Sequence, residues 1–136
     1  MTVVPLRLGP GDDLRLALEA WLGQRNGQAG WVISGIGSLS VAQIRLAGQA
    51  RITSFSGDLE LLQLAGSLCR DGAHLHLAIA DHQGVVTGGH LCAGSLVRTT
   101  AEVLLAEVPH WQFRRELDPA TGYRELQIRP FPSCNP

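Results

Sequence analysis

Residues 73–92 read AHLHLAIADHQGVVTGGHLC, and this stretch decides both the fold and the candidate site. Its first arm, residues 73–80, is apolar enough for a β-strand, in which successive side chains alternate between the two faces. His74 and His76 therefore share one face of this arm, and the leucines that follow each of them share the other. Turn-forming residues come next and the extended pattern then restarts, so we predict a β-hairpin.

The length of the hairpin loop decides which side chains face one another. A three-residue loop, His82-Gln-Gly84, with its glycine in the left-handed conformation of a G1 bulge, places His90 opposite His76. Cys92 then falls opposite His74. Directly opposed Cβ atoms lie about 4.5–5.5 Å apart, and two imidazoles at this spacing can share a zinc ion at bond lengths of roughly 2.0–2.1 Å. A two-residue loop would turn the third histidine to the other face unless a bulge compensated.

We interpret His74, His76 and His90 as ligands of a metal ion, because an H-x-H pair faces a third histidine on the predicted partner strand. Zinc is the expected ion, although three imidazoles also suit copper, nickel or ferrous iron. Cys92 or Glu60 would complete the coordination sphere. The alternative is that the histidines are half-buried polar groups satisfied by backbone carbonyls, and that Glu60 is a solvated charge.

The composition indicates a single domain over residues 1–136, long enough to bury a core of its own. A formal net charge of −1 argues against the basic surface that grips nucleic acid, so autonomous DNA binding is not expected. The three cysteines form no C-x-x-C pair, which makes a reducing cytoplasm the expected location. The chain start lacks a signal-peptide pattern, and no apolar run reaches the about 18 residues of a membrane span, so no membrane contact is expected.

The clearest local pattern outside the hairpin predicts a helix. Asp12 or Asp13 offers an N-cap, apolar residues then recur at helical spacing, and Asn26-Gly27 provides a C-terminal stop. Residues 2–8 before this helix are predicted to form a strand, which Pro5 directs to the edge of a sheet.

Short strands are predicted for most of the remaining chain. They cover residues 31–33, 40–47, 51–55, 59–68, 94–97, 101–108, 110–117 and 123–128. The glycine-rich residues 34–38 carry no nucleotide-binding signature and are predicted to form a tight bend between strands. Residues 130–136 contain too many prolines for regular structure and are predicted to form an irregular tail.

Several motifs, taken in order along almost the whole chain, resemble the PPC ("plants and prokaryotes conserved") domain. They are Gly11–Leu14, Ser34–Leu39, Gly57–Gly66, Gly72–Leu77, Gly88–Leu91 and Thr99–Val103. The resemblance implies an α/β (α+β) domain with a mixed, strongly bent β-sheet, one main N-terminal helix and assembly as a homotrimer. In plant members the domain accompanies AT-hook motifs in DNA-associated nuclear proteins and serves in self-association and partner binding. This chain contains no Arg-Gly-Arg-Pro hook.

The fold implied by the resemblance is also similar to that of acetolactate decarboxylase, in which an H-x-H pair and a later histidine hold zinc. His74, His76 and His90 match that ligand order. Glu60 could correspond to the active-site glutamate of that enzyme. A shared fold with shared ligands does not by itself imply shared chemistry.

Three functions fit these features, and we favour the first. It is a trimeric metal-binding module that regulates or binds a protein partner without established catalytic activity. The second is a zinc-dependent lyase or hydrolase, in which Glu60 donates or accepts a proton and Arg98 holds a substrate carboxylate. The third is a DNA-associated accessory protein whose trimer displays a composite basic patch. The arginines of that patch would be Arg7, Arg45, Arg51, Arg70, Arg114 and Arg115.

Overall fold

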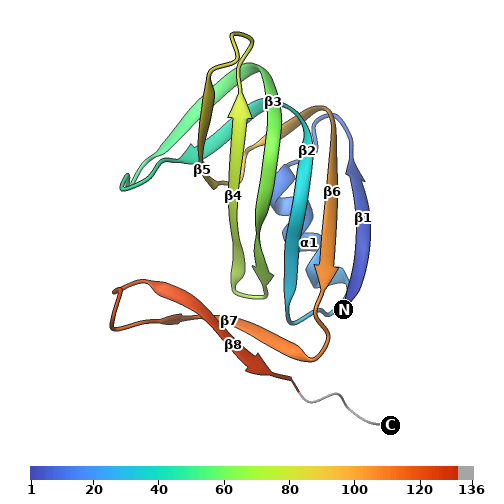
Figure 1. Cartoon of the computed structure of the whole chain (residues 1–136), viewed down its shortest axis with the longest axis vertical. Helices are drawn as coiled ribbons and strands as arrows, with labels where there is room; N and C mark the ends of the chain where they lie inside the picture. Colours follow the sequence, from blue (N-terminus) through green and yellow to red (C-terminus); the bar gives the residue numbers. More distant parts are fainter. Residues whose placement is uncertain (132–136) are drawn as a thin grey trace.

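The structure, a computed structural model, describes residues 1–131 and combines one helix with a larger and a smaller β-sheet (Figure 1). In chain order the elements are β1 (Thr2–Leu8), α1 (Leu14–Gln24), β2 (Gly30–Arg45), β3 (Ile52–Cys69), β4 (Gly72–Ala80), β5 (Val86–Leu91), β6 (Leu96–Glu107), β7 (Trp111–Leu117) and β8 (Arg124–Pro130). The predicted α+β class, with one main N-terminal helix, is confirmed.

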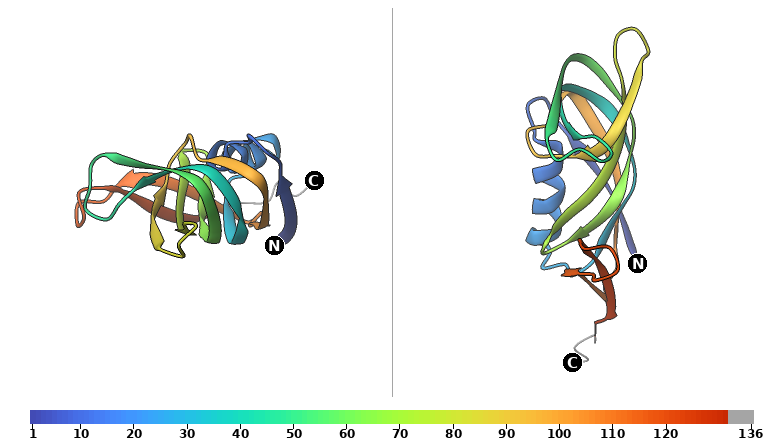
Figure 2. Two further views of the ribbon diagram at one scale, coloured as in Figure 1. Left: turned by 90° about the horizontal axis from the view of Figure 1, so that it is seen from above. Right: turned by 90° about the vertical axis from the view of Figure 1, so that its left-hand side faces the viewer.

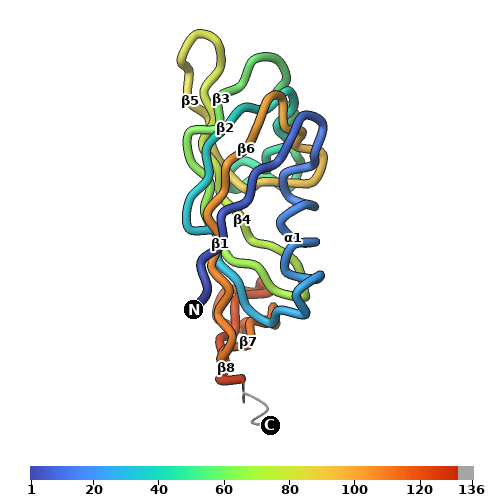
Figure 3. Tube along the Cα trace, turned by 90° about the vertical axis from the view of Figure 1, so that its right-hand side faces the viewer, coloured from blue at the N-terminus to red at the C-terminus, as the bar shows by residue number. Residues whose placement is uncertain are grey.

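Helix α1 forms where the sequence predicts it. Asp13 accepts a hydrogen bond from the Leu16 backbone N–H at 3.0 Å, which satisfies one of the amides left free in the first turn. Asn26, with a φ of 53°, follows the last turn and ends the helix. The buried side chains of the helix recur at helical spacing and are Leu14, Leu18, Trp21 and Leu22. They pack on the sheet, so α1 covers one of its faces (Figures 2 and 3).

No helix among residues 1–131 is long and apolar enough to span a membrane.

The larger sheet has the strand order β1-β6-β2-β3-β4-β5, and its pairings within residues 1–131 are all antiparallel. The sheet bends so far that β5 pairs with β2 as well as with β4. The predicted strong bend is therefore confirmed, but the predicted mixed sheet is wrong. The helix connection does make β1 and β2 run in the same direction, yet β6 lies between them and is antiparallel to both. As Pro5 predicts, β1 lies at an edge.

The glycine-rich residues 34–38 are not the predicted bend but part of the continuous strand β2. Gly37 has a φ of 151°, and a Cβ placed on it would overlap the carbonyl oxygen of Thr100 on β6. Gly35 lies against Leu64 and Val103 in the same crowded region. These glycines let neighbouring backbones approach closely inside a bent sheet. Because tight turns are also rich in glycine, the sequence alone does not distinguish the two roles.

Two further pairs of predicted strands are each a single long strand. β3 joins predicted residues 51–55 to 59–68, and β6 joins 94–97 to 101–108. Gly57, with a φ of 122°, lies in the middle of β3, where the pairing register with β2 shifts. Glycine and polar residues therefore mark a bulge here and not the end of a strand.

The smaller sheet, β7 and β8, forms an arm at one end of the larger sheet (Figure 1). Phe113 of this arm is buried in a small cluster with Ala29 and Cys69, and both of the strands predicted for the arm are present. β8 continues to Pro130, so the predicted irregular tail begins later than expected. Residues 132–136 of that predicted tail lie outside the described residues.

The close approach of β2 and β6 predicts a large effect of a single methyl group. Gly37→Ala should lower the free energy of unfolding by about 2 kcal/mol or more, because it adds a steric overlap with backbone to an unfavourable φ. Gly23→Ala, in the helix and with no atom within 4 Å of the added Cβ, is the matched control and should be neutral or stabilising by up to about 1 kcal/mol. Urea unfolding at fixed protein concentration measures both, and equal stability of the two variants would contradict the close-packing account.

Candidate metal centre

The β4–β5 hairpin has the register that the three-residue loop predicts. Asp81 donates its backbone N–H to the Val85 carbonyl at 3.1 Å, and Gly84 has a φ of 79°. His90 of β5 is consequently paired with His76 of β4. The leucines that alternate with these histidines are buried in the core. The histidine side chains therefore lie on the opposite face of the strands, which faces solvent and the β7–β8 arm.

The three predicted ligands converge on that face. The Nε2 atoms of His74 and His76 lie 3.2 Å apart, and His90 completes a group whose ligand atoms all lie within 4.8 Å of one another. Ring centroids are 4.6 to 5.2 Å apart. Tetrahedral zinc with N–Zn bonds of about 2.0–2.1 Å separates two ligand nitrogens by about 3.3 Å. The donor types and their spacing therefore fit a metal ion, which these three histidines could hold.

Cys92 does not join this group. β5 ends at Leu91, and the backbone N–H of Cys92 donates to the Gln43 carbonyl of β2 at 2.9 Å. The predicted pairing of Cys92 with His74 is wrong, because the chain leaves β4 after His90 and turns toward β2. The Cys92 sulfur lies 3.6 Å from the His90 carbonyl oxygen, so the thiol contacts backbone.

Glu60 and Arg98 are not brought to the histidines either. Glu60 is paired with Ala80, four residues along β4 from His76, which corresponds to about 13 Å of strand. Arg98 belongs to β6, separated from β4 by two strands, and forms an ion pair with Asp58 at 2.7 Å. The resemblance to the glutamate of acetolactate decarboxylase therefore does not extend to a position beside the histidines.

The arginines of the predicted composite patch do not form a single patch within one chain. Arg7 lies on β1, at the sheet edge opposite to β4 and β5. Arg70 donates to backbone carbonyls after the helix, and Arg114 is paired with Asp71 at 3.0 Å. Arg115 instead lies close enough to His74, and Arg45 close enough to His90, to lower the pKa of that histidine.

Burial and neighbouring charge favour the neutral form of two imidazoles. Burial, then the Arg115 guanidinium, lowers the pKa of His74, although Glu125 opposes this shift. Burial, then Arg45, lowers the pKa of His90. A neutral ring keeps a nitrogen lone pair free, which is the state that binds metal.

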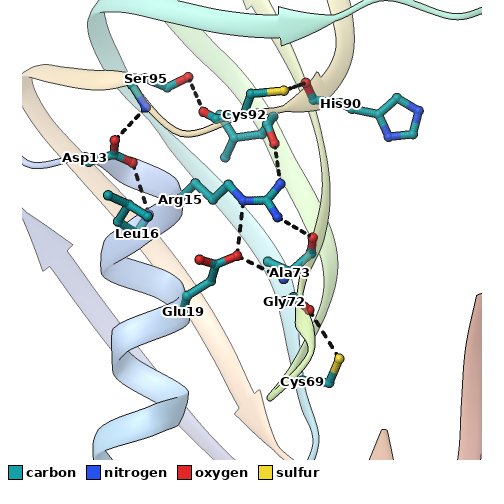
Figure 4. Close-up of polar contacts among 12 residues, drawn as sticks. Asp13, Arg15, Leu16, Glu19, Cys69, Gly72, Ala73, His90, Cys92 and Ser95 are labelled. Atoms are coloured by element: carbon teal, nitrogen blue, oxygen red, sulfur yellow. Dashed lines mark hydrogen bonds and ion pairs between the residues drawn. The ribbon is translucent and has the colours of Figure 1, made fainter. Parts of the chain in front are cut away.

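Arg15 of α1 is a positioning residue that the sequence does not reveal. Its guanidinium donates to the carbonyls of Ala73 and Leu91, both at 2.9 Å, and so links β4 to β5 one residue away from His74 and His90 (Figure 4). Glu19 accepts from this guanidinium at 3.1 Å and from the Ala73 N–H at 3.0 Å. The only sequence signal is an Arg–Glu pair spaced i, i+4, which is typical of an exposed helix surface.

The structure thus defines a small α+β domain, with a bent antiparallel sheet, one covering helix and three convergent histidines at β4 and β5. The chain belongs to the Plants and Prokaryotes Conserved (PCC) domain family, whose model matches residues 1–109. This is the family that the sequence motifs resemble.

Two solved structures and a longer protein are similar to this chain. A hypothetical protein from Salmonella has 40% sequence identity and a TM-score of 0.92, covering 95% of this chain and 94% of that one. A metal-containing protein from Archaeoglobus fulgidus has 26% identity and a TM-score of 0.78, covering 93% and 94%. A "Bifunctional protein GlmU" of Synechococcus is 52% identical over 96% of this chain. The chain spans about a fifth (21%) of the length of that relative.

The electrostatics of the site predict the titration of the metal-free protein. His74 and His90 should both titrate below about 6.5, the pKa of a free histidine, because burial and arginines disfavour the imidazolium. Because the folded protein favours the neutral rings, the two histidines do not destabilise the fold above about pH 6.5. As the pH falls through their folded-state pKa values, protonation lowers the free energy of unfolding. Arg115→Gln should raise chiefly the pKa of His74, and Arg45→Gln chiefly that of His90. NMR titration measures these values, and values at or above 6.5 in the unmodified protein would refute the prediction.

Proposed function

We propose that this domain is a cytoplasmic zinc-binding module that acts by regulating or binding a protein partner. The observation that carries the proposal is the convergence of His74, His76 and His90, whose ligand atoms lie within 4.8 Å of one another. Three imidazoles at this spacing suit zinc, and the surroundings of His74 and His90 lower the pKa of each and so favour its neutral form. The similar protein from Archaeoglobus fulgidus is described as metal-containing, which supports the assignment of a metal.

The proposal of a module rests on where similar sequence occurs. A region 52% identical to this chain forms part of a much longer bifunctional protein in Synechococcus. A domain that also occurs within a larger chain is suited to act on, or together with, a neighbouring protein. Glu60, the acid–base group that the enzymatic alternative names, is paired with Ala80, four residues along β4 from His76, and so gives that alternative no support.

We further propose that the domain assembles as a homotrimer. The sheet face opposite α1 carries exposed apolar side chains, including Trp31, Ile36 and Leu104. Ile36 of β2 is 52% exposed, although it lies in the middle of the sheet. Burying this face against further copies of the chain would remove apolar surface from water.

Metal content tests the zinc site. Untagged protein reconstituted with zinc should hold about one ion per chain, and His76→Ala should weaken zinc binding by at least about 100-fold, since even residues that only support ligands contribute 10–100-fold. His82→Ala, at the exposed tip of the same hairpin, is the matched control and should bind normally. Elemental analysis and a competitive chelator titration measure both quantities. Less than about a tenth of an ion per chain in both the untreated and the reconstituted protein would sink the proposal, because a three-histidine site binds zinc readily.

The mass of the assembly tests the trimer. Ile36→Glu should reduce the mass measured by light scattering, because a carboxylate would be buried without a partner at the proposed interface. Leu16→Glu changes an equally exposed residue, also 52%, on the helix and should leave the mass unchanged. A monomeric unmodified protein at micromolar concentration, or equal effects of both substitutions, would count against the proposed interface.

A further inference from the structure

A cavity of about 860 Å³ opens beside the candidate metal centre and is lined by His74 and His90. Its volume lies within the range of about 300–1,000 Å³ that small-molecule sites occupy. Six of the residues that line it are charged: four arginines, Arg15, Arg45, Arg115 and Arg124, and two acidic residues, Asp71 and Glu125. The cavity therefore has a formal excess of two positive charges before any metal is bound.

Arg45 is placed to hold an anion next to His90. The two residues are directly paired between β2 and β5, and Ile44 and Leu91 beside them are buried on the other face. His90 is also paired with His76, so a guanidinium and two imidazoles form one row across three strands. Arg45 is half-buried and forms no ion pair with any residue in the range 1–131.

Arg115 brings a second guanidinium from the arm to the same cavity. It donates to the Ser67 hydroxyl at 2.6 Å, and Ser67 is paired with His74 between β3 and β4. Arg115 is half-buried, and within the described part of the chain its guanidinium has no carboxylate partner.

The other charges of the cavity are already engaged. Asp71 pairs with Arg114 at 3.0 Å and accepts the Arg115 backbone N–H at 2.9 Å. Arg15 pairs with Glu19 and with the two strand carbonyls (Figure 4). Arg124 donates to the Arg115 carbonyl at 2.6 Å, and Glu125 accepts from the Thr121 hydroxyl at 3.1 Å. Arg45 and Arg115 are thus the two half-buried guanidiniums of the cavity that form no ion pair within residues 1–131, whereas Arg124 is exposed.

We propose that the cavity binds a small oxyanion, a carboxylate or a phosphate, between Arg45 and Arg115 and next to the metal. This inference rests on the proposed zinc site, in which three protein ligands leave one coordination position open to such an anion. Two half-buried guanidiniums and a metal favour oxyanions over neutral molecules, because charge-assisted hydrogen bonds to carboxylate or phosphate are roughly twice as strong as neutral ones. The partner-binding module would thereby also sense a small anionic ligand.

Cobalt-substituted protein provides the test, because the visible spectrum of bound Co²⁺ changes when an anion enters its coordination sphere. Succinate and inorganic phosphate, titrated separately at constant ionic strength, should each be compared with an uncharged diol. At least one of the anions should shift the spectrum in a saturable way, and calorimetry on the zinc protein should give the same dissociation constant. Arg45→Gln and Arg115→Gln should each weaken binding by about tenfold or more, as expected for a lost charge-assisted hydrogen bond. Arg7→Gln, on the distant strand β1, is the control.

The outcomes separate this inference from the zinc site itself. Normal metal content with no saturable response to either anion at millimolar concentration in the unmodified protein would overturn the inference and leave the zinc proposal standing. A lower assembly mass of Arg45→Gln, together with no response of the unmodified protein, would show that a carboxylate of another copy occupies the cavity, which also overturns it. Equal binding by the Arg7→Gln control and both cavity variants would place the anion elsewhere.

Discussion

The hairpin register between β4 and β5 is the constraint on which the site depends. Side chains in a strand alternate between faces, so a shift of one residue would turn His90 toward the core and leave His74 and His76 without a third partner. The left-handed Gly84 fixes the length of the loop, and Leu75, Leu77, Ile79 and Leu91 fix the register again by their burial on the opposite face. The packing of the core and the geometry of the candidate site therefore require the same register.

The bend of the sheet adds a second requirement, because β5 leaves β4 to pair with β2. Where two strands separate, their backbone groups lose partners, and buried groups without partners are costly. Arg15 and Glu19 supply those partners for Ala73 and Leu91 from the helix. The same separation turns Cys92 away from the histidines and brings Arg45 beside His90. Helix docking, sheet closure and the charge next to the site are thus parts of one arrangement.

Local patterns predict the features that local geometry controls. The hairpin register, the helix with its cap at Asp13 and the edge position of β1 all follow from turn residues, side-chain periodicity and a proline. The sequence cannot predict features that depend on which distant segments meet. The glycines of residues 34–38 read as a turn because close backbone packing and tight turns select the same residue. The sequence does not show that strand pairing keeps Glu60 away from the histidines, and the role of Arg15 requires contacts that are 58 and 76 residues away.

Three convergent imidazoles, two half-buried guanidiniums without carboxylate partners in the described chain and an open cavity lie together at one end of a bent sheet. Each part has a separate structural cause, yet all of them depend on the rings of β4 and β5 meeting at one point. Crystallography of zinc-treated protein, with anomalous scattering recorded at the zinc absorption edge, tests this directly. The account predicts one anomalous peak about 2.0–2.1 Å from a ring nitrogen of each of His74, His76 and His90. A His90 ring turned away from the other two, with no peak among them, would contradict it.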